Sequence, residues 1–163
     1  MAGSYIIVGT TGTGKTTFLK NRIANVKESA LFLYDVNNEY GKGEKLSKFE
    51  DFLKQATKLR ESVICFEEAT IFFGNKSDSR EMVELLVRKR HTNNTIFLVF
   101  HSLRSVPKNI AELVNGIFLF HTNDSVNGID TKFKNKDITD AYNRIKEKRT
   151  EKNPYIFEYI LIN

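Results

Sequence analysis

Residues 9–17 read "GTTGTGKTT" and decide the fold, because they follow a short apolar run, "YIIV" (5–8), and open a helical pattern. The spacing is Gly-x-x-x-x-Gly-Lys-Thr, from Gly9 to Thr16. Glycines allow the backbone to turn successive N–H groups toward a phosphate at a helix N-terminus. After a strand and before a helix, this spacing is typical of a phosphate-binding loop (P-loop). The sequence therefore predicts that the chain binds a nucleoside triphosphate.

Each part of this loop has an expected contact. Lys15 is expected to reach the β and γ phosphates, and the Thr16 hydroxyl is expected to bind Mg²⁺. The backbone of the whole loop surrounds the phosphates. The residues expected to bind the nucleotide are Gly9, Thr10, Thr11, Gly12, Thr13, Gly14, Lys15, Thr16 and Thr17.

Short apolar runs alternate with helical patterns along the chain. The runs are continuous and rich in branched or aromatic residues, as in strands buried on both faces of a parallel sheet. The expected strands are 5–8, 30–34, 63–66, 96–100 and 116–120, with a last strand within 154–162, and the expected helices are 16–26, 49–60, 80–90, 108–114 and about 137–148. This order predicts a P-loop NTPase fold, a three-layer α/β/α sandwich of RecA-like, additional-strand type with a mostly parallel central sheet.

Length and composition limit the possibilities. A chain of 163 residues suits one domain, here 1–163, with a core of about 5–121 and a C-terminal helix and strand within 137–162. The apolar runs are too short to span a bilayer, and no signal-peptide pattern is visible. Cys65 is the only cysteine. We therefore expect a cytoplasmic protein without a transmembrane segment. The net charge of +5 is compatible with a polyanionic partner but does not prove one.

Two glutamates end the apolar run of the stretch "VICFEEA". At this strand end, Glu67 is expected to hold Mg²⁺. Its neighbour Glu68 can act as the general base that activates a water molecule. A second acid is less needed for transfer of phosphate to a substrate, so the pair favours hydrolysis. The pair also fits a charged start to the next helix, where acids suit the helix dipole, and both interpretations can hold at once.

Two further groups are candidates for catalysis. His101 ends the run 96–100, which is expected to lie between the P-loop strand and the Glu67 strand. His101 would then lie near the γ-phosphate as a sensor, although a surface histidine at a strand end is the other interpretation. The stretch "RKRH" (88–91) closes a helix with cations. The helix dipole alone would favour them, and an arginine finger for a neighbouring subunit is the alternative.

A match to the guanine-recognition pattern Asn-Lys-x-Asp, "NKSD" (75–78), is better interpreted as a polar loop. It follows Glu68 too closely in the sequence, and "EEAT" replaces the Asp-x-x-Gly that guanine-binding proteins carry. The expected cofactors are therefore ATP, and not GTP, together with Mg²⁺.

With these residues, the chain resembles the HerA/FtsK superfamily of DNA-pumping ATPases, and within it the compact viral genome-packaging ATPases and Zot-like phage proteins. The segment "YDVNNEYG" (34–41) resembles the family's Asp-x-x-Gly-Glu-Tyr segment, with Asn38 in place of the usual Gly. The segment "RKRHTNNTIFLVFHSLRSVPKNI" (88–110) resembles the Arg-Lys stretch, the fourth strand and the polar sensor, where His101 replaces the usual Gln. The similarity extends from about residue 5 to 120.

The resemblance implies roles for further residues. Arg90 takes the place of the trans-acting finger, with Arg88 as the alternative. The family implies a ring, here of five or six subunits, with DNA in a central channel. The expected contacts to the DNA backbone are Lys76 and Arg80 after the Glu67 strand, and Arg104 and Lys108 after the His101 strand.

We therefore expect an ATP-hydrolysing DNA translocase that packages a viral or phage genome, in the host cytoplasm and against a capsid, portal or membrane component. A small P-loop nucleotide or metabolite kinase is one alternative. The acid pair and the absence of an obvious arginine-rich lid stand against it. An assembly- or secretion-associated ATPase that does not move DNA is another. ATP turnover that rises with DNA distinguishes the first function from the other two.

Overall fold

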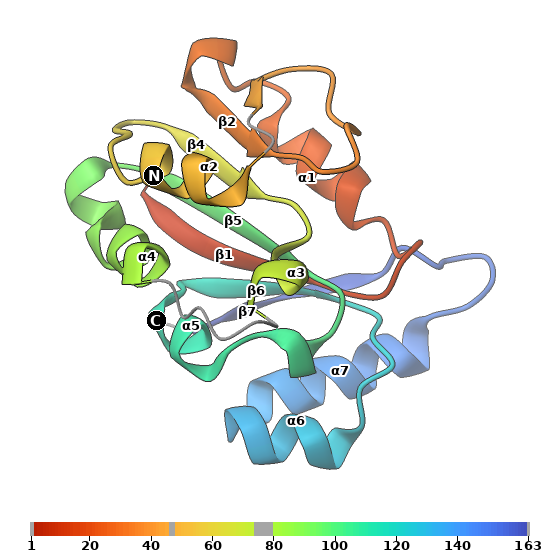
Figure 1. The fold of residues 1–163 in the computed structure, drawn as a ribbon. Coiled ribbons are helices and arrows are strands. Elements are labelled where there is room, and N and C mark those ends of the chain that lie inside the picture. Colours follow the sequence, from red (N-terminus) through yellow and green to blue (C-terminus); the bar gives the residue numbers. More distant parts are fainter. Residues whose placement is uncertain (1, 46–47, 74–79, 163) are drawn as a thin grey trace.

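The computed structural model describes residues 2–45, 48–73 and 80–162. In this part of the chain a central sheet has the strand order β3-β2-β4-β5-β1-β6-β7 (Figure 1). The strands are β1 (Gly3–Val8), β2 (Leu31–Tyr34), β3 (Glu44–Lys45), β4 (Val63–Phe66), β5 (Thr95–Phe100), β6 (Gly116–Phe120) and β7 (Phe157–Leu161). Strands β1 to β6 are parallel, and β7 pairs with β6 in the antiparallel direction. The expected fold class is confirmed, including the position of β5 between β4 and β1.

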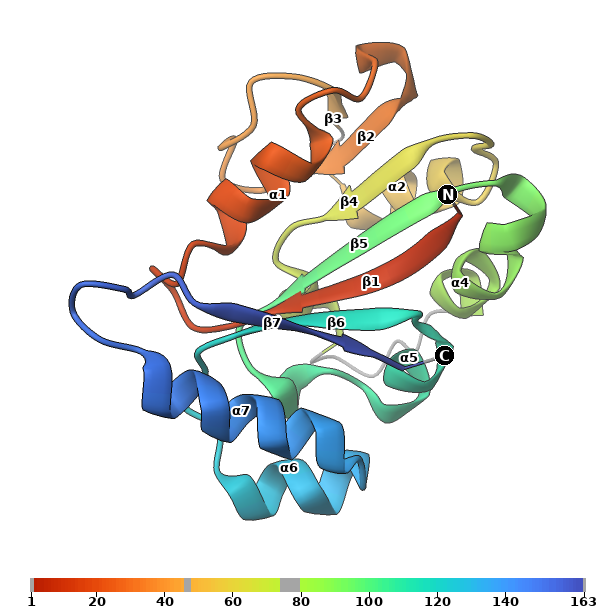
Figure 2. The same ribbon diagram turned by 180° about the vertical axis from the view of Figure 1, so that it is seen from behind.

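Helices cover both faces of the sheet. They are α1 (Lys15–Ile23), α2 (Phe49–Ala56), α3 (Ala69–Phe73), α4 (Arg80–Thr92), α5 (Lys108–Leu113), α6 (Val126–Phe133) and α7 (Lys136–Lys148), with 3₁₀ turns η1 (Glu28–Ala30) and η2 (Leu103–Ser105). Figure 1 shows α2 to α5 over one face, and Figure 2 shows α1 over the other. Helices α6 and α7 pack side by side next to β6 and β7. These layers form the predicted sandwich.

The strands are continuously apolar because both of their faces are buried. In β1, Ile6 and Val8 point into the core shared with α2, α4, α5, α6 and α7. The side chain between them, Ile7, points into the core shared with α1. Burying a side chain of this size contributes about 1.5–3 kcal/mol, so both faces of the strand stabilise the sheet.

Some elements differ from the sequence prediction. The helix expected over 49–60 ends at Ala56, where the chain turns and reaches a left-handed Glu61 (φ 52°). Strand β3 and helix α3 are too short for a periodic pattern to reveal them. Helix α6 does carry an N-cap signal, because the Ser125 hydroxyl accepts a hydrogen bond from the Gly128 N–H at 3.2 Å. Gly128 itself weakens the helical pattern, since glycine is unfavourable inside helices.

The P-loop is fixed at the carboxyl ends of the strands. The Gly9 N–H donates to the Phe100 carbonyl at 3.1 Å, and the Thr10 N–H donates to the His121 carbonyl at 2.8 Å. A Cβ atom added to Gly9 would lie 2.6 Å from Phe120 Cβ and 2.8 Å from Thr13 Oγ1. Gly9 is therefore required here for close packing against the end of β6.

Replacing Gly9 with alanine should destabilise the protein by about 1–3 kcal/mol, the usual cost of overpacking. The measurement is the free energy of unfolding in urea. Gly41→Ala is the matched control, because a Cβ atom at Gly41 meets nothing within 4 Å and its φ is outside the left-handed region. Equal stability of the two variants would contradict the packing role of Gly9.

Candidate active site

The P-loop presents a helix N-terminus without a side-chain cap. Gly12 and Gly14 adopt left-handed conformations with φ of 79° and 92°, and Gly14 is the N-cap of α1. The first N–H groups of a helix lack partners within the helix, so here they are free to bind an anion. The buried Lys15 Nζ donates to the Thr10 carbonyl at 3.0 Å, and Thr13 Oγ1 donates to the same oxygen at 2.7 Å. The loop therefore closes around its own lysine.

Glu67 is buried at the end of β4, beside Lys15. Its Oε2 accepts a hydrogen bond from the Tyr40 hydroxyl at 3.0 Å, and its Oε1 lies 3.5 Å from Thr16 Oγ1. The pKa of Glu67 is raised to about 7. Burial is the main cause, and the nearby carboxylates Glu39 and Glu68 act in the same direction, whereas the Tyr40 hydrogen bond and Lys15 oppose the rise. Burial also lowers the pKa of Lys15, against the attraction of the three carboxylates.

The segment after β2 supplies two site residues that sequence reasoning missed, Glu39 and Tyr40. Asp35 holds their backbone, because it accepts hydrogen bonds from the N–H groups of Glu39 at 3.0 Å and Tyr40 at 2.9 Å. Asn38, which replaces the usual Gly, takes the left-handed conformation (φ 53°) that asparagine tolerates, so the turn is kept. Glu39 Oε2 accepts a hydrogen bond from Thr16 Oγ1 at 3.1 Å. The signal was present, because this segment carried the resemblance, but no role was assigned to Glu39 or Tyr40.

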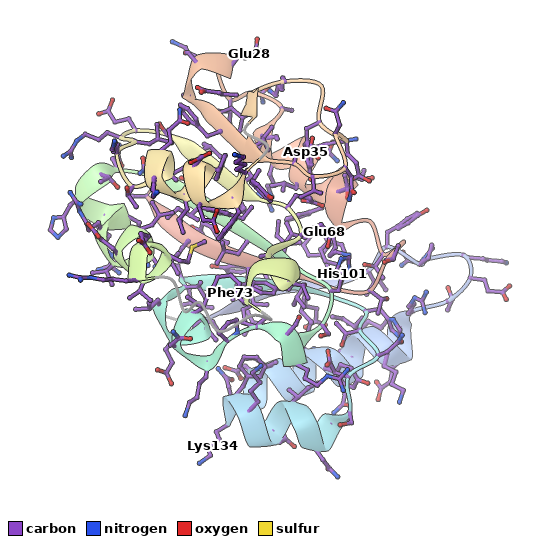
Figure 3. The ribbon with its side chains drawn as sticks, in the orientation of Figure 1. Glu28, Asp35, Glu68, Phe73, His101 and Lys134 are labelled. Atoms are coloured by element: carbon purple, nitrogen blue, oxygen red, sulfur yellow. The ribbon has the colours of Figure 1, made fainter. Side chains whose placement is uncertain are left out.

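Glu68 and His101 lie against each other. Glu68 Oε2 is 2.6 Å from His101 Nε2, and Figure 3 shows the two side chains adjacent below Asp35. The backbone N–H of His101 donates to Thr70 Oγ1 at 3.2 Å, which connects the end of β5 to α3. Glu68 has a φ of 60°. A left-handed conformation of such a residue costs of order 1–3 kcal/mol and is common at functional sites.

These groups share one pocket of about 380 Å³. Its size falls within the roughly 300–1,000 Å³ of small-molecule sites. It is lined by most of the P-loop together with Glu39, Glu67, Glu68 and His101. The structure therefore brings the predicted loop, acid pair and histidine together. Lys15 is the only lysine or arginine among the described residues that line this pocket.

The side chains around Thr16 fit an Mg²⁺ ion. Mg²⁺ prefers oxygen ligands and is usually held by one or two carboxylates together with phosphate oxygens. Thr16 Oγ1 has carboxylate oxygens of Glu39 and Glu67 at 3.1 Å and 3.5 Å. Hydroxyl and carboxylate oxygens therefore converge beside the helix N-terminus where phosphates would bind.

Arg90 is not part of this pocket. It is an exposed residue in the last turn of α4, which leads to the amino ends of the strands, where the Gly3 N–H donates to the Asn94 carbonyl at 3.1 Å. The P-loop lies at the opposite edge of the sheet. Arg88 pairs with Glu84 at 2.8 Å. The buried Lys89 Nζ donates to the Leu113 carbonyl at 2.5 Å.

The candidate DNA contacts are only partly described. Lys76 lies outside the described residues, as does the rest of 75–78. Arg80 begins α4, Arg104 lies in η2 and Lys108 begins α5, and all three side chains are exposed. Among the residues that the structure describes, no helix is long and apolar enough to cross a membrane.

Comparison with known proteins agrees with this fold. A family model described as "ATPase family associated with various cellular activities (AAA)" matches residues 5–136. No curated protein matches the sequence. The fold is similar to the genome packaging NTPase B204 from Sulfolobus turreted icosahedral virus 2 in complex with ATP-gammaS, with a TM-score of 0.80 and 17% identity over 99% of this chain and 93% of that chain. It is also similar to the N-terminal domain of zonular occludens toxin from Neisseria meningitidis, with a TM-score of 0.59 and 19% identity over 76% of this chain and 78% of that chain. At these identities the likeness concerns the fold, and at that level the expected resemblance is confirmed.

Glu67→Gln should stabilise the nucleotide-free protein. The ordinary pKa of the carboxyl is 4.5 and its folded value is about 7, so the unfolded chain ionises first as the pH rises. The folded state therefore loses stability progressively as the pH rises between these two values. Above them the loss is constant, on the order of 3 kcal/mol.

The measurement is the free energy of unfolding of both proteins without metal, between pH 4.5 and 7. The advantage of the variant should grow with pH over this window. Glu28→Gln, which removes an exposed carboxylate that does not line this pocket, is the control. A difference between Glu67→Gln and the parent that does not change with pH would contradict the burial penalty.

Proposed function

The chain belongs to the AAA family of ATPases, and we propose that it hydrolyses ATP to move DNA, as an oligomeric motor that packages a viral or phage genome. The observation that carries the proposal is the single pocket in which the P-loop meets Glu67, Glu68 and His101. The fold likeness to the genome packaging NTPase B204 supports the packaging task.

Binding of the nucleotide uses the P-loop. Lys15, which donates to the Thr10 carbonyl at 3.0 Å, exchanges this oxygen for oxygens of the β and γ phosphates. The free N–H groups at the start of α1 bind the remaining phosphate charge. Thr16 and Glu67 hold Mg²⁺, which when bound neutralises phosphate charge and orients the γ-phosphate. Mg²⁺ would bind the ionised carboxylate of Glu67, so metal binding would favour loss of the proton from this carboxyl group.

Hydrolysis uses Glu68 as the general base. Its carboxylate accepts a proton from water while the water oxygen bonds to the γ-phosphorus and the bond between that phosphorus and the β–γ bridging oxygen breaks. In the nucleotide-free protein Glu68 Oε2 is held by His101 at 2.6 Å. A γ-phosphate that attracts His101 releases the base. The pair thereby couples the activity of Glu68 to the presence of substrate.

Assembly into a ring of five or six subunits completes the site. An arginine finger stabilises the charge of the transferring phosphoryl group, and the pocket holds no described arginine of its own. Arg90 is exposed at the opposite edge of the sheet, so it can reach the nucleotide pocket of a neighbouring subunit but not the pocket of its own subunit. The basic residues Lys76, Arg80, Arg104 and Lys108 contact the phosphates of the DNA, in the host cytoplasm and next to a capsid or portal component.

ATP turnover should rise when duplex DNA is added, and the rise should disappear as the salt concentration increases, because phosphate contacts release counterions. Replacing Lys76, Arg80, Arg104 and Lys108 together with alanine should remove the stimulation and leave the basal turnover. The measurement is phosphate release with and without DNA over a salt series.

Glu68→Gln is the control for this experiment, since it should retain ATP binding and lose both basal and stimulated turnover. Basal turnover that never responds to DNA would contradict translocation and favour an assembly ATPase. Phosphate transfer to a small molecule in place of water would favour a kinase.

Arg90→Lys should bind ATP normally and hydrolyse it roughly a thousand-fold more slowly, because lysine lacks the planar fork of an arginine finger. As a helix cap alone, the residue would contribute only about 0.3–1 kcal/mol, and lysine would serve as well. Mixtures of Arg90→Lys and Glu68→Gln subunits should exceed the activity of either variant alone, since some interfaces then combine an intact finger with an intact base.

Arg88→Lys is the matched control on the same helical turn, because Arg88 is also exposed but pairs with Glu84 at 2.8 Å. It should keep near-normal turnover. If mixing gives no gain although subunits exchange, Arg90 does not act in trans. A loss of turnover in Arg88→Lys would then make Arg88 the candidate.

A further inference from the structure

One exposed aromatic ring stands beside the P-loop. Tyr155 lies on the connection between α7 and β7, which reaches the P-loop in both views (Figures 1 and 2). A Cβ atom built on Gly14 would lie 3.0 Å from Tyr155 Cδ1 and 3.6 Å from its Cβ and Cγ. The ring therefore lies directly against the N-cap of α1, next to the N–H groups that would bind phosphates.

The connection holds this tyrosine in place. The Asn153 N–H donates to the Thr150 carbonyl at 3.0 Å and lies 3.2 Å from Thr150 Oγ1, which forms a tight turn before Tyr155. Pro154 then fixes the backbone torsion φ immediately before Tyr155. Yet 65% of the tyrosine is exposed, and it lines the same pocket as the P-loop, Glu68 and His101. An aromatic ring with a large exposed surface is thus positioned at the pocket.

The strand order indicates which part of a nucleotide would meet this ring. Glu68 and His101 follow β4 and β5, which lie on one side of β1 in the sheet. Tyr155 precedes β7, which lies on the other side of β1, beyond β6. The γ-phosphate must lie beside Glu68 and His101 for hydrolysis, and the phosphates pass over the start of α1. The nucleoside end therefore points toward Tyr155.

We infer that the Tyr155 ring stacks on the base of the nucleotide and forms the wall of the base-binding subsite, an inference that rests on the proposed ATPase function. Aromatic side chains stack on bases because both present flat π faces. Such stacking tolerates any base, since every base has a π face. Tyr155 therefore contributes affinity for the nucleoside and does not select adenine over guanine.

The test compares ATP, GTP and inorganic triphosphate by titration calorimetry with the full chain. Tyr155→Ala should weaken both ATP and GTP by about five- to 150-fold, the range for one stacked base. It should leave the affinity for inorganic triphosphate unchanged, because that ligand has no base. Tyr155→Phe keeps the ring and should bind all three as the parent does. Leu161→Ala is the matched control, because Leu161 is a similarly exposed apolar residue (67%) on the adjoining strand β7.

Different outcomes separate this inference from the proposed function. Equal losses for ATP and inorganic triphosphate would mean that Tyr155 only supports the loop, and unchanged ATP affinity in Tyr155→Ala would mean that the base binds elsewhere. Either result overturns the stacking inference, while ATP binding by the parent protein still supports the proposed function. If the parent protein binds none of the three ligands, the proposed function fails and the inference fails with it.

Discussion

The burial of one carboxylate beside one lysine is the constraint on which the site depends. Glu67 and Lys15 are both buried at the carboxyl ends of the strands, and burial disfavours the charged form of each. Their attraction and the hydrogen bond from Tyr40 offset part of this penalty. Asp35 holds Tyr40 and Glu39 in position through two backbone N–H groups. Much of the segment after β2 therefore serves to keep one acid in place at the end of β4.

Two further features of the site lower the stability of the folded protein, and both leave groups available to a ligand. Glu68 has a left-handed backbone, and the start of α1 has no side-chain cap. A serine at the N-cap would strain the left-handed backbone of Gly14 (φ 92°), and its hydroxyl would occupy the N–H groups that phosphate needs. The sheet and its two cores supply the stability that makes these local costs tolerable. A marginally stable protein can carry a few such costs only where the surrounding structure holds the geometry.

Much of the fold and of the site could be predicted because parallel strands end at the same edge. The P-loop, Glu67 and His101 each follow an apolar run directly, so the sheet alone brings them together. The contacts of Glu39, Tyr40 and Tyr155 could not be predicted from periodicity, because their positions depend on turns, although the family resemblance of residues 34–41 marks the segment of the first two. Asn38 must be left-handed for Glu39 to reach Thr16, and the turn at Asn153 must form for Tyr155 to reach Gly14. No periodic pattern reports such conformations.

The sheet order also explains how one small chain can separate its tasks. The groups proposed for cleavage, Glu68 and His101, follow β4 and β5, and the ring proposed for the base precedes β7. The P-loop therefore lies between the proposed cleavage groups and the proposed base-binding residue. Arg90 is at the amino edge of the same sheet, away from both. Under the proposed function, Arg90 would supply its charge to the pocket of a neighbouring subunit. Hydrolysis would then depend on contact between subunits, and a ring that moves DNA needs such dependence, because its subunits must act in order.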